Sequence, residues 1–128
     1  MDYKILVIDD DDDHRFIITE CIKEAGYTNI IVAVNGEEGL EMVKTDKPDI
    51  VITDTDLGGV DGFEVCKRIK DKFPHIKVVV MTGHAVHVDF PKATEVGADE
   101  YKVKTGNCGE IIWGLKRCVA SLQEKDKS

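Results

Sequence analysis

Short apolar runs alternate with longer amphipathic stretches along the whole chain. Residues 29–34, 49–54 and 76–82 carry apolar residues at consecutive positions, rather than at every second position. A strand that is apolar on both sides is typical of a parallel sheet, because helices cover both faces of such a sheet. The stretches between these runs carry apolar residues at helical spacing. The alternation therefore predicts an α/β fold, a doubly wound parallel sheet with helices on both faces.

Turn residues and helix caps divide the chain into five strand–helix units. The strands are expected at residues 4–8, 29–34, 49–54, 76–82 and 99–104. The helices are expected at residues 13–26, 35–44, 62–73, 89–96 and 107–123. Residues 1–123 would then form one domain, and residues 124–128 a frayed tail.

We expect Asp13 to cap the first helix, and Asp11 and Asp12 to face water in the loop before it.

The first and last helices each have a predicted apolar face. The apolar residues of the first helix are Phe16, Ile17, Cys21 and Ile22. Those of the last helix are Ile111, Leu115, Cys118 and Leu122.

Composition and charge exclude several classes of protein. The 128 residues are 42% hydrophobic and 33% charged, which is typical of one compact domain. A formal net charge of -8 argues against direct nucleic-acid binding, which requires clustered Lys and Arg. No apolar stretch approaches the roughly 20 residues of a membrane span. The N-terminus also lacks the basic start and cleavage site of a signal peptide, so we expect a cytoplasmic protein.

Cysteine and histidine spacing gives no metal or redox motif. The four cysteines form no CxxC pair and have no His at the spacing of metal ligands. We therefore expect reduced, partly buried thiols. No carboxylate or cysteine arrangement suggests ligation by His14, His75 or His87, and we expect all three at the surface.

Polar side chains stand at the ends of the predicted strands. Asp9 and Asp10 follow the first strand, Asp54 ends the third, Thr82 ends the fourth, and Lys104 lies near the end of the fifth. In a doubly wound sheet the carboxyl ends of the strands form the ligand-binding edge, so these residues are expected to converge. Clustered carboxylates repel one another unless a cation is shared. Mg²⁺ prefers such oxygen ligands, which makes it the expected cofactor.

The remaining residues at this edge suit a phosphoryl group. Lys104 supplies a compact positive charge, Thr82 supplies a hydroxyl donor, and Gly83 leaves space beside them. Together with a carboxylate nucleophile and a divalent metal, these groups predict transfer of a phosphoryl group onto an aspartate.

Four segments of the chain resemble the signature segments of a known family. These segments are VIDD, DIVITDTDLGGVDGFEV, VVVMTGHA and VGADEYKVK, in that order and at near-typical intervals. They resemble the receiver domain of two-component response regulators, which is CheY-like. The resemblance covers essentially the whole chain and implies a flavodoxin-like (βα)5 fold with strand order 2-1-3-4-5.

The resemblance implies a role for each matching acidic residue. Asp54 looks like the phosphoacceptor. Asp9 and Asp10 look like the acidic pair that holds Mg²⁺ together with Asp54, with Asp10 the more direct ligand. The backbone carbonyl of Asp56 would supply a further ligand.

Three further residues match the switching and phosphoryl-binding positions of the family. Thr82 looks like the hydroxyl that moves toward the phosphoryl group, and Tyr101 like the aromatic side chain that follows it. Lys104 looks like the lysine that bonds the acyl phosphate.

The chain departs from the family pattern at several positions. Gly58 stands where proline is usual, and Thr105 stands where a cis proline usually follows the lysine. Because a cis bond before a residue other than proline costs about 2.5 to 4 kcal/mol, we expect a trans bond at Thr105. Asp56 and His84 match positions that influence dephosphorylation in the family, so we expect them to tune the lifetime of the phosphoryl group.

The resemblance implies a phosphorylation-controlled switch rather than an enzyme that turns over a separate substrate. A sensor histidine kinase, a phosphotransfer protein or a small phosphodonor would phosphorylate Asp54. The domain would catalyse only its own phosphorylation and dephosphorylation. Its output partner would bind the fourth helix, fifth strand and fifth helix, without direct contact to nucleic acid or membrane. Either a monomer or a phosphorylation-dependent dimer is compatible with this scheme.

Two alternatives remain at the level of sequence. Asp54-Thr55-Asp56 has the DxD form of a haloacid-dehalogenase-type phosphatase. That family places the motif on its first strand and has Thr or Val where Gly58 stands, so the match is poor. The second alternative is a receiver-like module that binds partners without being phosphorylated, against which the complete acidic site argues.

Overall fold

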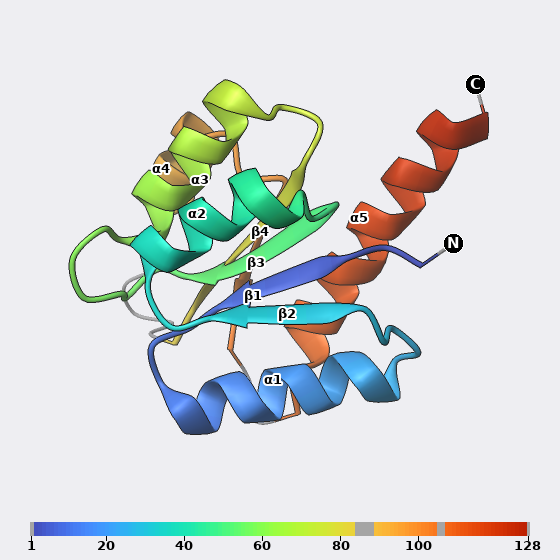
Figure 1. The fold of residues 1–128 in the computed structure, drawn as a ribbon, viewed down its shortest axis with the longest axis horizontal. Helices are drawn as coiled ribbons and strands as arrows, with labels where there is room; N and C mark the ends of the chain where they lie inside the picture. The colour runs from blue at the N-terminus through green and yellow to red at the C-terminus, as the bar shows by residue number, and fades with distance from the viewer. Residues whose placement is uncertain (1, 84–88, 105–106, 128) are drawn as a thin grey trace.

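The computed structural model describes residues 2–83, 89–104 and 107–127 (Figure 1). In this part of the chain five strands form one parallel sheet in the order β2-β1-β3-β4-β5. The strands are β1 (Ile5–Ile8), β2 (Ile30–Ala33), β3 (Ile50–Asp54), β4 (Lys77–Thr82) and β5 (Glu100–Val103). The predicted doubly wound, flavodoxin-like sheet and its strand order are confirmed.

Five helices cover the two faces of the sheet (Figure 1). They are α1 (Asp12–Glu24), α2 (Gly36–Asp46), α3 (Gly62–Lys72), α4 (Phe90–Glu95) and α5 (Gly109–Lys127). The last helix therefore extends beyond residue 123, where we predicted its end. Thr105, His84 and His87 lie outside the described residues, and so do the predictions made for them.

The strands bury both of their sides in separate apolar layers. Ile5 and Val7 pack with α1 and α5, whereas Leu6 and Ile8 pack with α2 and α3. This alternation explains why the strands are apolar at consecutive positions. Ile111, Leu115 and Cys118 of α5 are buried in the first layer, and Leu122 packs against it, as the sequence predicted.

The start of α1 differs from the prediction. Asp11, rather than Asp13, is the N-cap, and its Oδ1 accepts a hydrogen bond from the amide of His14 at 3.0 Å. Asp12 and Asp13 lie in the first turn, where their charges interact favourably with the positive end of the helix dipole. The prediction that Asp13 caps the helix was wrong, because five consecutive aspartates offer several equivalent caps. Asp12 lies in the helix rather than in the loop before it, but both Asp11 and Asp12 are exposed, as expected.

The buried face of α1 is also rotated from the prediction. Ile18 and Ile22 are buried, whereas Phe16 is 66% exposed and Ile17 is 45% exposed. Cys21 is partly buried against the same layer. Residues four apart share one helix face, so burial of Ile18 with Ile22 turns Phe16 and Ile17 toward solvent. The prediction that these two side chains face the core was wrong.

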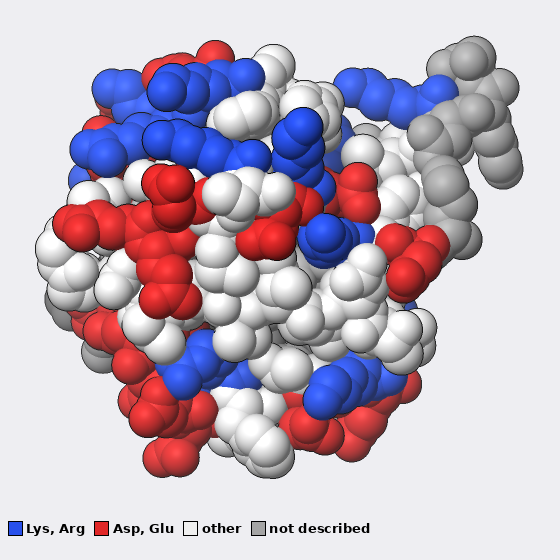
Figure 2. All heavy atoms as spheres, viewed as in Figure 1, with Lys and Arg blue, Asp and Glu red and all other residues white. Residues whose placement is uncertain are grey.

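Surface charge is unevenly distributed over this acidic chain. Lys and Arg side chains gather over α3 and the adjoining part of α2, at the top of the view in Figure 2. Lys44, Arg68 and Lys72 border a hollow of about 260 Å³ between these two helices.

Among the described residues, no helix is both long and apolar enough to span a membrane.

Gly62, the first residue of α3, packs directly behind the end of β3. A Cβ atom at this position would lie 2.7 Å from the carbonyl carbon of Asp54 and 2.9 Å from the Cα of Thr55. Backbone atoms cannot move aside as a flexible side chain can, so only glycine fits here. Gly62 thereby allows α3 to lie against the backbone that carries Asp54.

Substitution of Gly62 tests this contact. Overpacking of this kind predicts that Gly62→Ala lowers the free energy of unfolding by about 2 kcal/mol or more, measured by urea denaturation. Gly58→Ala is the matched control, because a Cβ atom at that position would have no described heavy atom within 4 Å beyond its chain neighbours. We expect the control to change stability by no more than about 0.5 kcal/mol. Equal stabilities of the two variants would contradict the close approach of α3 to β3.

Candidate functional site

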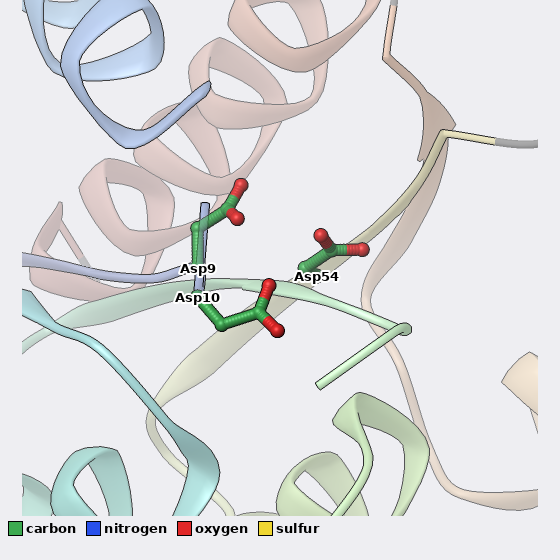
Figure 3. A group of neighbouring side chains, drawn as sticks. All are labelled: Asp9, Asp10 and Asp54. Carbon is green, nitrogen blue, oxygen red and sulfur yellow. The ribbon is translucent and has the colours of Figure 1, made fainter. Parts of the chain in front are cut away.

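The register of the sheet brings the polar residues at the strand ends together. Ile8 pairs with Thr53, so Asp9 and Asp54 come next to each other just beyond this pair. Thr82 pairs with Val103, and the amide of Lys104 then donates to the carbonyl of Thr82 at 2.8 Å. In Figure 3 the carboxylates of Asp9, Asp10 and Asp54 extend toward the same region. The expected convergence at the carboxyl edge is therefore present.

Asp9 is fully buried and has partners on both carboxylate oxygens. Its Oδ1 accepts from the amide of Asp11 at 2.9 Å, and its Oδ2 accepts from Nζ of Lys104 at 2.8 Å. Arg15 donates through Nη1 to the backbone carbonyl of Asp9 at 2.8 Å. The hydrogen bonds to its two carboxylate oxygens offset part of the cost of burying this side chain.

Asp54 is 6% exposed and occupies the last position of β3. Its Oδ1 accepts from the amide of Asp56 at 3.1 Å, and its Oδ2 accepts from Nζ of Lys104 at 2.7 Å. Burial raises the pKa of the Asp54 carboxyl above its ordinary value, and the hydrogen bonds from Lys104 and Asp56 offset only part of this effect. Ionised Asp54 therefore depends on nearby positive charge.

Lys104 supplies that charge from the end of β5. Its Nζ donates to Asp9 and Asp54 and lies 3.2 Å from Nδ1 of His14, so three groups surround an ammonium that has three donors. Burial acts to lower the pKa of Lys104, but the hydrogen bonds to Asp54 and Asp9 raise that pKa by more, and the net shift is upward. The ammonium is therefore held in its charged form.

The contact of His14 with Lys104 was missed in the sequence. The His14 side chain is 52% exposed, as expected for a surface residue, yet it contacts Lys104 at the edge of the site. Both residues also line a hollow of about 290 Å³. No sequence spacing signals this contact, because it joins the first turn of α1 to a residue near the other end of the chain.

The carboxylate cluster suits a divalent cation. One oxygen from each of Asp9, Asp10 and Asp54 lies within 4.8 Å of the other two, and Asp10 is exposed to solvent. The three carboxylates carry more negative charge than the single Lys104 ammonium can neutralise. Carboxylate oxygens are the hard ligands that Mg²⁺ prefers, so the donor set fits this ion in both type and charge.

Thr82 and Tyr101 lie on the neighbouring strands β4 and β5. Thr82 is buried at the end of β4, and both residues line a small hollow of about 10 Å³. The hydroxyl of Tyr101 accepts a hydrogen bond from the amide of Asp89 at 3.0 Å. Its ring also makes edge contacts with Phe63 and Phe90, at centroid distances of 5.8 Å and 5.3 Å. Tyr101 thus connects β5 to the first turn of α4.

The loop after Asp54 is held mainly through its backbone. The Asp56 side chain is exposed, and its amide binds Asp54. Leu57 is buried among the side chains of the second apolar layer, whereas Gly58 is exposed. Gly59 has a φ of 85°, a conformation that glycine adopts without strain.

The comparisons with known proteins agree with this arrangement. Residues 5–115 match the family model of the response regulator receiver domain. The transcriptional regulatory protein AfsQ1 of Streptomyces coelicolor is 34% identical over 97% of this chain and 54% of its own length. A protein-glutamate methylesterase/protein-glutamine glutaminase of Natronomonas pharaonis is 35% identical over 96% of this chain and 34% of its own length. The chain thus spans about half or less of these relatives.

A solved structure shows the same fold. The response regulator protein TrrA from Thermotoga maritima, in complex with Mg(2+)-BeF, is 33% identical to this chain, with a TM-score of 0.82. The match covers 91% of this chain and 98% of that chain. On the strength of the family match over most of its length, the chain belongs to the response regulator receiver domain family.

Proposed function

We propose that Asp54 accepts a phosphoryl group and that this modification switches the affinity of the domain for a protein partner. The observation that supports the proposal most directly is the position of Lys104, whose ammonium bonds both Asp9 and Asp54 beside three converging carboxylates. Such an arrangement provides a nucleophile, a cation site and a donor for phosphoryl oxygens in one place.

Each residue of the site has a distinct part in the proposed reaction. A carboxylate oxygen of Asp54 attacks the phosphorus atom of the donor, and the donor's leaving group departs with the bonding electron pair. Asp9, Asp10 and Asp54 would hold Mg²⁺, with the carbonyl of Asp56 as a further ligand. The bound ion would supply positive charge beside the phosphoryl oxygens.

Lys104 and Thr82 then hold the phosphoryl group on Asp54. The Lys104 ammonium exchanges its hydrogen bond to the Asp54 carboxylate for one to a phosphoryl oxygen, because the modified group carries more negative charge. The hydroxyl of Thr82 provides a second donor from β4. The backbone hydrogen bond between Lys104 and Thr82 keeps the two residues side by side.

The aromatic contacts of Tyr101 support an output path through α4. Movement of Thr82 toward the phosphoryl group changes the space beside Tyr101, and reorientation of Tyr101 removes its hydrogen bond to the Asp89 amide. Phosphorylation would then favour one of two pre-existing states of the surface formed by α4, β5 and α5. We propose this surface as the site of the output partner or of a phosphorylation-dependent dimer, and a histidine kinase or phosphotransfer protein as the phosphodonor.

Phosphorylation of Asp54 is tested with acetyl phosphate and Mg²⁺, followed by intact-mass measurement. We expect one phosphoryl adduct per chain, and no adduct on Asp54→Asn. Lys104→Met should slow labelling on the order of a hundredfold, because it removes the cation that stabilises developing negative charge. Asp13→Asn is the control, since it removes an acid of the same run outside the cluster, and it should label like the wild type. Labelling of Asp54→Asn, or steady turnover of p-nitrophenyl phosphate, would contradict the proposal.

Binding of Mg²⁺ is tested by its effect on stability. At a concentration about tenfold above the dissociation constant, Mg²⁺ should raise the free energy of unfolding by about 1.4 kcal/mol, because it binds the folded cluster. Asp54→Asn removes one of the three carboxylates, so its response should be much smaller. Asp13→Asn should respond fully, and equal responses of the two variants in urea titrations would argue against a metal site at this cluster.

The proposed influence of Asp56 and His84 is measured as the decay of phospho-Asp54 after removal of the donor. Both positions flank the reacting groups in sequence, and the amide of Asp56 binds Asp54 directly. We expect Asp56→Asn and His84→Ala to change the decay rate without abolishing labelling. Lys67→Ala on the exposed side of α3 serves as the control. An unchanged decay rate in both test variants would remove these residues from the proposed mechanism.

A further inference from the structure

Cys21 and Cys108 meet where α1 approaches the start of α5. Both residues pack in the same apolar layer, although they are far apart in the sequence. The Cys21 thiol also lies 4.0 Å from the carbonyl of Asn107, the residue before Cys108. Cys108 is buried in the apolar layer, and Cys21 packs against that layer while remaining partly exposed. The spacing of the cysteines, which form no CxxC pair, does not indicate this proximity.

Cys108 and Cys21 each line a hollow at the surface. Cys108 lines the hollow of about 290 Å³ that also contacts His14 and Lys104. Cys21 lines a second hollow of about 360 Å³, together with Asn107 and Trp113. A small oxidant can therefore approach the pair without unfolding of the domain.

The other two cysteines provide an internal contrast. Cys66 and Cys118 are both buried, and the Cys66 thiol lies 3.6 Å from the carbonyl of Val96. Burial raises the pKa of each of these two thiols to about 12. Burial and the neighbouring Cys21 raise the pKa of Cys108 to about 12 as well. Cys21 is partly exposed, whereas the other three thiols are buried, so an oxidant in the solvent reaches Cys21 first.

We propose that Cys21 and Cys108 form a redox modification site, a dithiol that hydroperoxides convert to an intramolecular disulfide. The Cys21 thiolate attacks one oxygen of hydrogen peroxide and becomes a sulfenic acid, while the other oxygen leaves as water after taking up a proton. The Cys108 sulfur then attacks the Cys21 sulfur and displaces a second water. Overall, two thiols lose two electrons and two protons, and one hydrogen peroxide is reduced to two waters.

The disulfide would join α1 to the segment that follows Lys104. Cys108 has a φ of 59°, an uncommon conformation for a residue with a side chain, and its carbonyl accepts from the amide of Ile112 in the first turn of α5. The bond would thus add a covalent restraint near both the Lys104 side of the site and the start of α5. It also closes a long loop of the chain, which restricts the unfolded state.

The test treats the reduced full chain with hydrogen peroxide, then alkylates it with N-ethylmaleimide in denaturant and maps the products by mass spectrometry. We expect monomeric protein in which Cys66 and Cys118 are alkylated, while Cys21 and Cys108 are linked and become alkylatable after dithiothreitol. The oxidised form should also unfold at a higher temperature than the reduced form. Alkylation of all four cysteines, a bond to Cys66 or Cys118, or disulfide-linked dimers would overturn the proposal.

Variants separate the roles of the two thiols. Cys108→Ser should retain a sulfenic acid at Cys21 that dimedone traps, whereas Cys21→Ser should yield no intramolecular bond. Cys66→Ser is the matched control, because it removes a buried cysteine from the other face of the sheet and should leave the disulfide intact. Circular dichroism shows whether each variant is folded. Should Cys108→Ser not fold, Cys108→Ala replaces it, and absence of a dimedone adduct in the folded variant would contradict the assignment of Cys21 as the attacking thiol.

Discussion

The Lys104 ammonium and its hydrogen bonds to Asp9 and Asp54 are the interaction on which the site depends. The parallel pairing of β1 with β3 places these two buried carboxylates next to each other. Their mutual repulsion would be strong there without a cation. A salt bridge this well shielded contributes little net stability, because desolvation of the charges offsets their attraction. Its consequence is positional, since it fixes the Asp54 carboxylate, the Lys104 ammonium and the Asp9 carboxylate relative to one another.

The sheet and most helices follow from periodicity and caps that are visible in the sequence. Strands buried on both sides require long apolar runs, and single capping residues such as Asn35 leave little freedom in where a helix begins. The start of α1 was not predictable, because five aspartates in a row satisfy the same capping rule. The choice of Asp11 as the N-cap depends on Asp9. The Asp9 carboxylate accepts a hydrogen bond from the amide of Asp11 and so fixes the turn before the helix. Tertiary structure thus decides what local preference leaves open.

The part of the candidate site that lies at the strand ends was predictable from the sequence. Asp9, Asp54 and Lys104 each stand at or just beyond the end of a strand, so their convergence follows from parallel topology alone. The contact of Lys104 with His14 and the approach of Cys21 to the residue before Cys108 do not follow from topology. They depend on how α1 is rotated against the sheet, and the apolar pattern of α1 predicted only part of its buried face, Cys21 and Ile22.

The distribution of burial indicates where a change at Asp54 has its largest structural effect. The residues of β1 and β3 are buried along their whole length, whereas every residue of β5 is only partly buried. The short helix α4 has a single buried residue, Ala93, and the Tyr101 hydroxyl contacts its N-cap. Elements with few buried contacts rearrange at lower free-energy cost than the core strands. A change in the partners of Lys104 therefore acts on a rigid centre at β1 and β3, and on a more adaptable edge at β5 and α4.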